Sequence, residues 1–256
     1  MTPPLLPIAR ANAEYDIIGT LPLIVRGDLD FNRITIFCGN YRRRGICSLF
    51  LDGVPILLHR DLQKSGGAFL SYLKGARPAD VITSKAAPFF DAIACKDLGT
   101  ARMIAERLPR NWNREEEYED DFLYVFFLMK SFFLDGTEQE NGDIVDRYGK
   151  LLEGASEVRL DLCQALLRKD NIAFEEAVHS LILQQADILR QRLNRGEIID
   201  EEWAVEGQFF VEGLALIRLA ELRGFTTERN YRFIPSLAIE SAALNLDPES
   251  WKDPYG

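Results

Sequence analysis

The sequence predicts an all-α protein built as an irregular array of antiparallel helical hairpins. Apolar residues recur at intervals of three and four through most of the chain, as on the buried stripe of an amphipathic helix. Several of these stretches end in a short turn that contains aspartate, and another helical stretch follows at once. Because Asp, Asn and Gly permit tight turns, the second helix of each pair is expected to pack back on the first.

The first hairpin follows two segments that are harder to interpret. Residues 1–27 are punctuated by proline and predict no clear element. Residues 31–37 are rich in β-branched side chains and partly alternate, so a small β element is the alternative to the helix that we expect there. A helical stretch then ends at Asp52-Gly53, and a second one covers residues 54–74.

Later elements follow the same pattern of helix, Asp-containing turn and helix. They are expected over residues 89–97 and 98–108, 122–133, 162–170 and 171–192, and 209–223. Gly224, directly after Arg223, is typical of the residue that ends a helix. The unequal intervals between the turns exclude a regular repeat protein, although the hairpins loosely resemble a tetratricopeptide array.

No Gly/Ser-rich linker divides the chain. We expect an N-terminal helical portion over residues 1–77, packed on a larger C-terminal portion over residues 78–256, as one compact unit. Residues 252–256, after Trp251, are expected to form a loose tail.

The composition is that of an acidic globular protein. The chain has 256 residues, 47% of them hydrophobic, and a formal net charge of -10. This charge argues against nucleic acid or an anionic membrane as a partner and favours a basic protein. The run Arg42-Arg43-Arg44 is therefore expected to be a solvated or snorkelling stretch on a helix rather than a nucleic-acid site.

The N-terminus has no basic stretch before an apolar run, and no apolar run reaches the length of a membrane helix. A cytoplasmic protein is expected. Its oligomeric state stays open.

Residues typical of catalysis are scarce. The chain has two histidines and none of the common nucleotide-binding, hydrolase or metalloprotease motifs, so neither an enzyme nor a cofactor is expected. His179 shares a helical turn with Glu175 and Glu176, which favours surface pairing over a catalytic base. The four cysteines include no C-x-x-C pair and are expected to be reduced core residues, with a Cys38–Cys47 disulfide as the alternative.

The densest charge feature is an acidic run that comprises Glu115, Glu116, Glu117, Glu119, Asp120 and Asp121. One interpretation is a helix start, with Asn113 as N-cap and acidic side chains complementing the helix dipole. A second is an acidic surface that binds a partner, and the two can coexist. A metal site is the third, but the ion would need further carboxylates from elsewhere, so no metal is expected.

From about Tyr41 to Pro235 the chain resembles the immunity protein 49 family of bacterial antidote proteins. The pieces that carry the resemblance lie at residues 50–53, 89–97, 117–124, 165–170, 210–220 and 233–236. The most distinctive is the fifth, with its Glu-Gly-Leu-Ala-Leu core at residues 212–216. In this piece Glu212, Gly213 and Arg218 are expected to be structural, with Glu212 pairing with a buried arginine that holds two helices in register.

The resemblance implies a mostly helical immunity protein of a polymorphic-toxin or contact-dependent competition system. Such a protein would bind a cognate toxin domain in the cytoplasm and neutralise it by stoichiometric occlusion. The toxins of these systems are often nucleases, and an acidic antidote suits a basic toxin domain. The alternatives are a helical scaffold that binds a peptide or protein partner, and an enzyme that reverses the modification made by a toxin.

Overall fold

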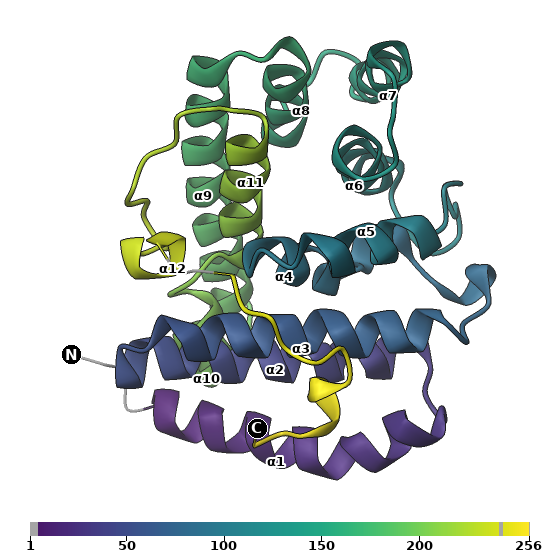
Figure 1. Cartoon of the computed structure of the whole chain (residues 1–256). Helices are drawn as coiled ribbons and strands as arrows, with labels where there is room; N and C mark the ends of the chain where they lie inside the picture. Colours follow the sequence, from purple (N-terminus) through teal and green to yellow (C-terminus); the bar gives the residue numbers. More distant parts are fainter. Residues whose placement is uncertain (1–4, 241–242, 256) are drawn as a thin grey trace.

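A computed structural model describes residues 5–240 and 243–255, and within these residues the fold is all-α (Figure 1). The nearest approach to a sheet there is an isolated antiparallel bridge between Tyr231 and Ile234. The α-helices are α1 Leu5–Arg26, α2 Phe31–Asp52, α3 Pro55–Leu73, α4 Ala87–Ala94, α5 Leu98–Arg107, α6 Glu119–Phe132, α7 Glu138–Leu151, α8 Val158–Arg168, α9 Asn171–Asn194, α10 Asp200–Glu206, α11 Val211–Leu222 and α12 Ser236–Glu240. Three short 3-10 segments, Pro78–Asp80, Thr83–Lys85 and Ser250–Lys252, complete the list.

The proline-punctuated start of the chain forms one long helix. The buried residues of α1 include Leu6, Ala9, Ala13 and Ile17, which lie three or four positions apart on one face. This face packs on α2. Pro22 lies inside α1 near its end. The sequence did not predict this element because its apolar stripe is narrow and the prolines obscure it.

The strand considered for residues 31–37 is wrong, because this segment is the first third of α2. Asp30 caps the helix by accepting a 2.8 Å hydrogen bond from the Arg33 amide. At the other end Gly53 has φ of 67°, and its amide donates to Leu49 O. The capped ends outweigh the local β preference of the segment, and the predicted turn at Asp52-Gly53 is confirmed.

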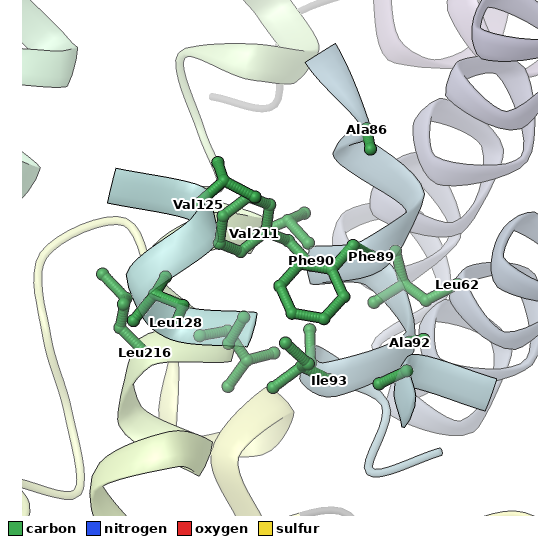
Figure 2. Close-up of a cluster of buried hydrophobic side chains, with 14 of the residues drawn as sticks. Leu62, Ala86, Phe89, Phe90, Ala92, Ile93, Val125, Leu128, Val211 and Leu216 are labelled. Carbon is green, nitrogen blue, oxygen red and sulfur yellow. The ribbon is translucent and has the colours of Figure 1, made fainter. Parts of the chain in front are cut away.

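The core is centred on α4, the short helix that lies between the three long N-terminal helices and the C-terminal helices. Figure 2 shows Phe89 and Phe90 of α4 with Leu62 of α3 on one side, and Val125 of α6 and Leu216 of α11 on the other. Both phenylalanines are buried. The N-terminal and C-terminal parts of the fold thus share one hydrophobic cluster. The boundary drawn at residue 77 stays a prediction.

Two of the predicted hairpins each have a Lys-Asp dipeptide at the turn. Lys96 and Lys169 have φ of 64° and 56°, in the left-handed region that ends a helix. The next residue caps the following helix: Asp97 accepts from the Thr100 amide, and Asp170 accepts from the Ile172 amide. The turns are confirmed, and their Asp side chains act as N-caps.

The expectation that residues 42–44 form a solvated or snorkelling stretch is wrong for Arg42 and Arg44. Arg44 is buried and makes two hydrogen bonds to Asp61 of α3, at 2.6 and 2.8 Å. Arg42 makes two to the buried Asp91 of α4, at 2.6 and 2.9 Å. The arginines are neutralised by carboxylates far away in sequence, which a local run of charges does not reveal.

The C-terminal segment is held against α2 and α3, so the expectation of a loose tail is wrong for residues 252–255 (Figure 1). Tyr41 donates a 2.6 Å hydrogen bond to Trp251 O, and Arg44 donates one of 2.9 Å to Pro254 O. Lys64 donates to Asp253 O. Trp251 itself is fully buried. The segment supplies carbonyl acceptors to polar groups that the first helices bury.

The cysteine prediction is confirmed: Cys38, Cys47, Cys95 and Cys163 are free and buried, and the alternative Cys38–Cys47 disulfide is wrong. Burial raises the pKa of the Cys47 thiol to about 12. Buried thiols of this kind behave as small hydrophobic side chains. No described helix is long and apolar enough to cross a membrane.

Candidate functional site

The acidic run lies in the connection between α5 and α6 and in the first turn of α6. Residues 113–118, which we name the acidic turn, come before the helix. The Glu116 and Glu117 amides both donate to Asn113 O, at 3.2 and 3.1 Å. Asn113 Oδ1 accepts from the Glu115 amide within the turn. The expectation that Asn113 caps the helix is therefore wrong, since α6 begins at Glu119 and Tyr118 is its N-cap residue.

Glu117 points inward and fixes the shape of the acidic turn. Its carboxylate accepts from the Ser84 amide at 2.8 Å and from the Asn113 amide at 3.3 Å. Trp112 Nε1 donates to Glu117 O at 2.9 Å. These bonds join the turn to the segment that precedes α4. Glu117 is therefore a structural residue of the turn, and its carboxylate is not offered to solvent.

Four other side chains of the turn are exposed, among them Arg114, whose guanidinium lies 5.1 Å from the centre of the Trp112 ring. Glu115 and Glu116 face solvent, and Tyr118 is 78% exposed. Neither glutamate carboxylate has an ion-pair or hydrogen-bond partner in the described parts of the chain. The surface of the turn thus combines an exposed aromatic ring with the carboxylates of Glu115 and Glu116.

The three acids of α6 have different environments. Glu119 accepts a 2.7 Å hydrogen bond from Arg147 of α7, and Asp121 accepts one of 2.9 Å from Arg159 of α8. Asp120, between them, is half-buried and has no such partner among the described residues. All three complement the positive end of the α6 dipole. Among the residues that the structure describes, Glu115, Glu116 and Asp120 thus have no cationic partner.

Arg159 is a residue that the sequence did not single out. It lies 3.6 Å from Glu212 as well as 2.9 Å from Asp121, and its guanidinium covers the Tyr124 ring at 4.8 Å. Tyr124 donates a 2.9 Å hydrogen bond to Glu212. Glu212 therefore pairs with an arginine whose charge is shared between two carboxylates. The pairing connects α6, α8 and α11, and no local sequence signal identifies the partner.

Gly213 and Arg218 connect α11 to the chain that follows it. A β-carbon at Gly213 would lie 2.5 Å from Phe210 Cδ1 and 2.7 Å from Ile234 Cδ1. Only a glycine therefore allows these two side chains to pack so closely on the α11 backbone. Arg218 is buried and donates to Ala238 O at 3.1 Å and to Ile239 O. The distinctive segment of the sequence is thus a packing and hydrogen-bonding centre.

His59 of α3 bonds to the same carbonyl as Arg218. Its Nε2 lies 3.0 Å from Ala238 O, which can only accept, so Nε2 carries the proton. Burial, together with the positive charge of nearby Arg218, lowers the pKa of His59 to about 4. The neutral imidazole therefore belongs to the contact that holds α12 against α3.

Acid is expected to weaken the fold through His59. Its folded pKa of about 4 lies below the unfolded value of about 6.5, so the unfolded chain binds a proton first as pH falls. The contribution of neutral His59 to the free energy of unfolding is intact above about pH 6.5. It falls progressively as the pH decreases to about 4, by about 3 kcal/mol. Urea unfolding across this range should show a shallower pH slope for His59→Gln, which keeps a donor for Ala238 O. Parallel slopes would contradict the assignment.

One group in the described residues has the composition of a cation site. Ligand atoms of Glu175, His179 and Glu228 lie within 4.8 Å of one another at the surface. Their contacts are those of a polar cluster: His179 Nε2 lies 3.0 Å from Glu228 Oε1, and Tyr231 donates to Glu175 at 2.9 Å. The surface pairing expected for His179 therefore involves Glu228 of the loop after α11, and Glu175 bonds to Tyr231.

The comparisons with known proteins return one family. No curated protein and no solved structure matches the chain significantly. The sequence profile of the family "Immunity protein 49" matches residues 82–238, more than half of the chain. This range contains the acidic turn, the Arg159–Glu212 pair and all of α11, and it begins later than the resemblance that starts near Tyr41. The chain therefore belongs to the immunity protein 49 family.

Proposed function

We propose that this protein neutralises a cognate antibacterial toxin in the cytoplasm. It would bind the toxin at a fixed stoichiometry and occlude the functional surface of the toxin. Membership of an immunity protein family supports a toxin as the partner. The acidic turn is the observation that carries the proposed mode of binding. Its backbone is held by Glu117 from within, while Glu115, Glu116 and Tyr118 face outward.

A surface that is already fixed before it meets its partner loses little conformational entropy on binding. The two unpaired glutamates would attract a basic toxin domain and increase the rate of encounter. Tyr118 would then supply the aromatic contact that protein interfaces favour. The overall charge of -10 acts in the same direction. Asp120 adjoins this surface, and we include it in the proposed interface.

Co-expression tests the proposal. The toxin domain encoded beside this gene is expressed with and without this protein, and the complex is purified on one tag. We expect rescue of growth together with a complex of fixed stoichiometry. Rescue without a complex would indicate enzymatic reversal of the damage by the toxin. A lack of rescue, with many weak partners recovered instead, would favour a helical scaffold.

Charge reversal of Glu115, Glu116 and Asp120 to lysine is expected to slow association with the toxin roughly 10-fold or more, because exposed charges of an interface act mainly on the association rate. Surface plasmon resonance at low and at high salt measures this. The matched control reverses Glu176 and Asp187, which are exposed on α9. If both variants slow association equally per charge reversed, net charge would explain the effect and the acidic turn would not belong to the interface.

A further inference from the structure

A groove lies beside the acidic turn, between the α1–α2 connection and the segment after α3. Its volume is about 1080 Å³, and Glu116 is part of its wall. Phe31, Tyr72 and Ile82 contribute apolar surface to it. The groove therefore joins the acidic turn to the N-terminal helices, which lie before the segment that matches the family. This volume slightly exceeds the roughly 300–1,000 Å³ of small-molecule sites, so the groove is large enough to receive a long side chain.

Four carboxylates line the groove: those of Asp28, Asp30, Asp80 and Glu116. Two of them have partners, because Asp30 caps α2 and Asp80 bonds to Arg77 at 2.7 and 2.8 Å. The carboxylates of Asp28 and Glu116 have neither an ion-pair nor a hydrogen-bond partner within residues 5–240 and 243–255.

The groove also has two arginines, and both have contacts of their own. Arg77 pairs with Asp80, and Arg26 donates to Pro22 O at 3.0 Å. The lining therefore has a surplus of negative charge around an apolar surface.

The ring of Tyr72 is held in place within this surface. It stacks on Phe69 at 6.3 Å with an angle of 25° and meets Phe31 at 6.5 Å. Burial raises the pKa of the Tyr72 hydroxyl, and the charges of Asp80 and Asp30 raise it further. These carboxylates therefore lie close enough to the ring to make its surroundings attractive to a cation.

We propose that the groove receives an arginine side chain of the toxin domain, with the guanidinium over Tyr72 and between the unpaired carboxylates of Asp28 and Glu116. The inference rests on the proposed function and names a contact within it. The aliphatic part of arginine suits the apolar lining, and its planar cation stacks on aromatic rings and binds carboxylates in pairs. An apolar side chain would instead remove the unpaired carboxylates from water without compensation, and an anion would be repelled.

The test uses the full-length protein with Asp28→Asn and Tyr72→Leu combined, and the affinity for the neighbouring toxin domain is measured by calorimetry. The matched control combines Asp187→Asn with Tyr15→Leu, which changes an exposed aspartate and an exposed tyrosine outside the groove. We expect the groove variant to lose affinity roughly 10- to 100-fold, and the control to change less than about 2-fold. Asp28→Asn alone, which disturbs no packing, should give part of the loss at an unchanged melting temperature.

The outcomes separate this inference from the proposed function. If the unaltered protein binds the toxin and the groove variant binds equally well, the groove inference is overturned and the proposed function stands. If the unaltered protein does not bind the toxin, the proposed function fails, and an amidated hexa-arginine peptide becomes the probe. Hydrogen exchange should then slow at residues 28–34 and 71–82 in the unaltered protein but not in Asp28→Asn. Equal protection in both, or none in either, would overturn the groove inference.

Discussion

Asp61→Ala is expected to cost about 3–5 kcal/mol of unfolding free energy, because it leaves a buried arginine without its carboxylate. The side chains of Arg44 and Asp61 are 7% and 1% exposed, and they meet through two hydrogen bonds of 2.6 and 2.8 Å. Lys64 is close by, and burial lowers its pKa to about 8, whereas Asp61 acts to raise it. Removal of Asp61 would leave both cations in a region with little water.

Urea unfolding at neutral pH measures this loss. Asp187→Ala is the matched control, because Asp187 pairs with Arg190 at 3.5 Å while both side chains are well exposed. Such pairs contribute less than about 1 kcal/mol, so the control should unfold almost as the unaltered protein does. A loss below about 1 kcal/mol for Asp61→Ala would show that Arg44 finds other partners, and the description of a tightly coupled pair would have to be abandoned.

Gly213→Ala is expected to destabilise the protein by about 1–3 kcal/mol, because the added methyl group has no room. Its β-carbon would lie 2.5 Å from a ring carbon of Phe210 and 2.7 Å from the terminal carbon of Ile234. The ring carbon is constrained by the core, whereas the end of Ile234 can rotate away. The close approach of α11 to its neighbours would then be lost, together with part of the contact around the Tyr231–Ile234 bridge.

Gly142→Ala supplies a control for which the expected change in stability has the opposite sign. Gly142 lies inside α7, and a β-carbon there would meet nothing within 4 Å. Alanine is the better helix former, so this variant should gain about 0.5–1 kcal/mol. Thermal and urea unfolding of the two variants side by side would separate the packing effect from helix propensity. Destabilisation of both, or of neither, would contradict the assignment of Gly213 as a close-approach site.

The parts of the fold that follow from local chemistry could be predicted from the sequence. The all-α class and the hairpin turns depend on residues within a few positions of one another, as the Lys96-Asp97 and Lys169-Asp170 turns show. The preference for helix over strand at residues 31–37 was correct, although the Asp30 cap that contributes to it was not foreseen.

What could not be predicted depends on contacts between distant residues. The triplet Arg42-Arg43-Arg44 looks solvated unless Asp61 and Asp91 are known to lie beside it. The acidic run looks uniform, but Ser84 from a separate segment turns one of its glutamates inward. The groove could not be foreseen for the same reason, because three segments that are separate in sequence form its wall.

The C-terminal segment has a consequence for how the protein folds during its synthesis. The hydrogen bond from Tyr41 to Trp251 spans 210 positions, and Arg44 meets Pro254 over the same interval. The ribosome therefore produces α2 and α3 long before the acceptors for their buried donors exist. Contacts of such separation slow folding. A chain that ends a few residues before Pro254 is therefore expected to leave buried donors of α2 without their acceptors and the fold incomplete.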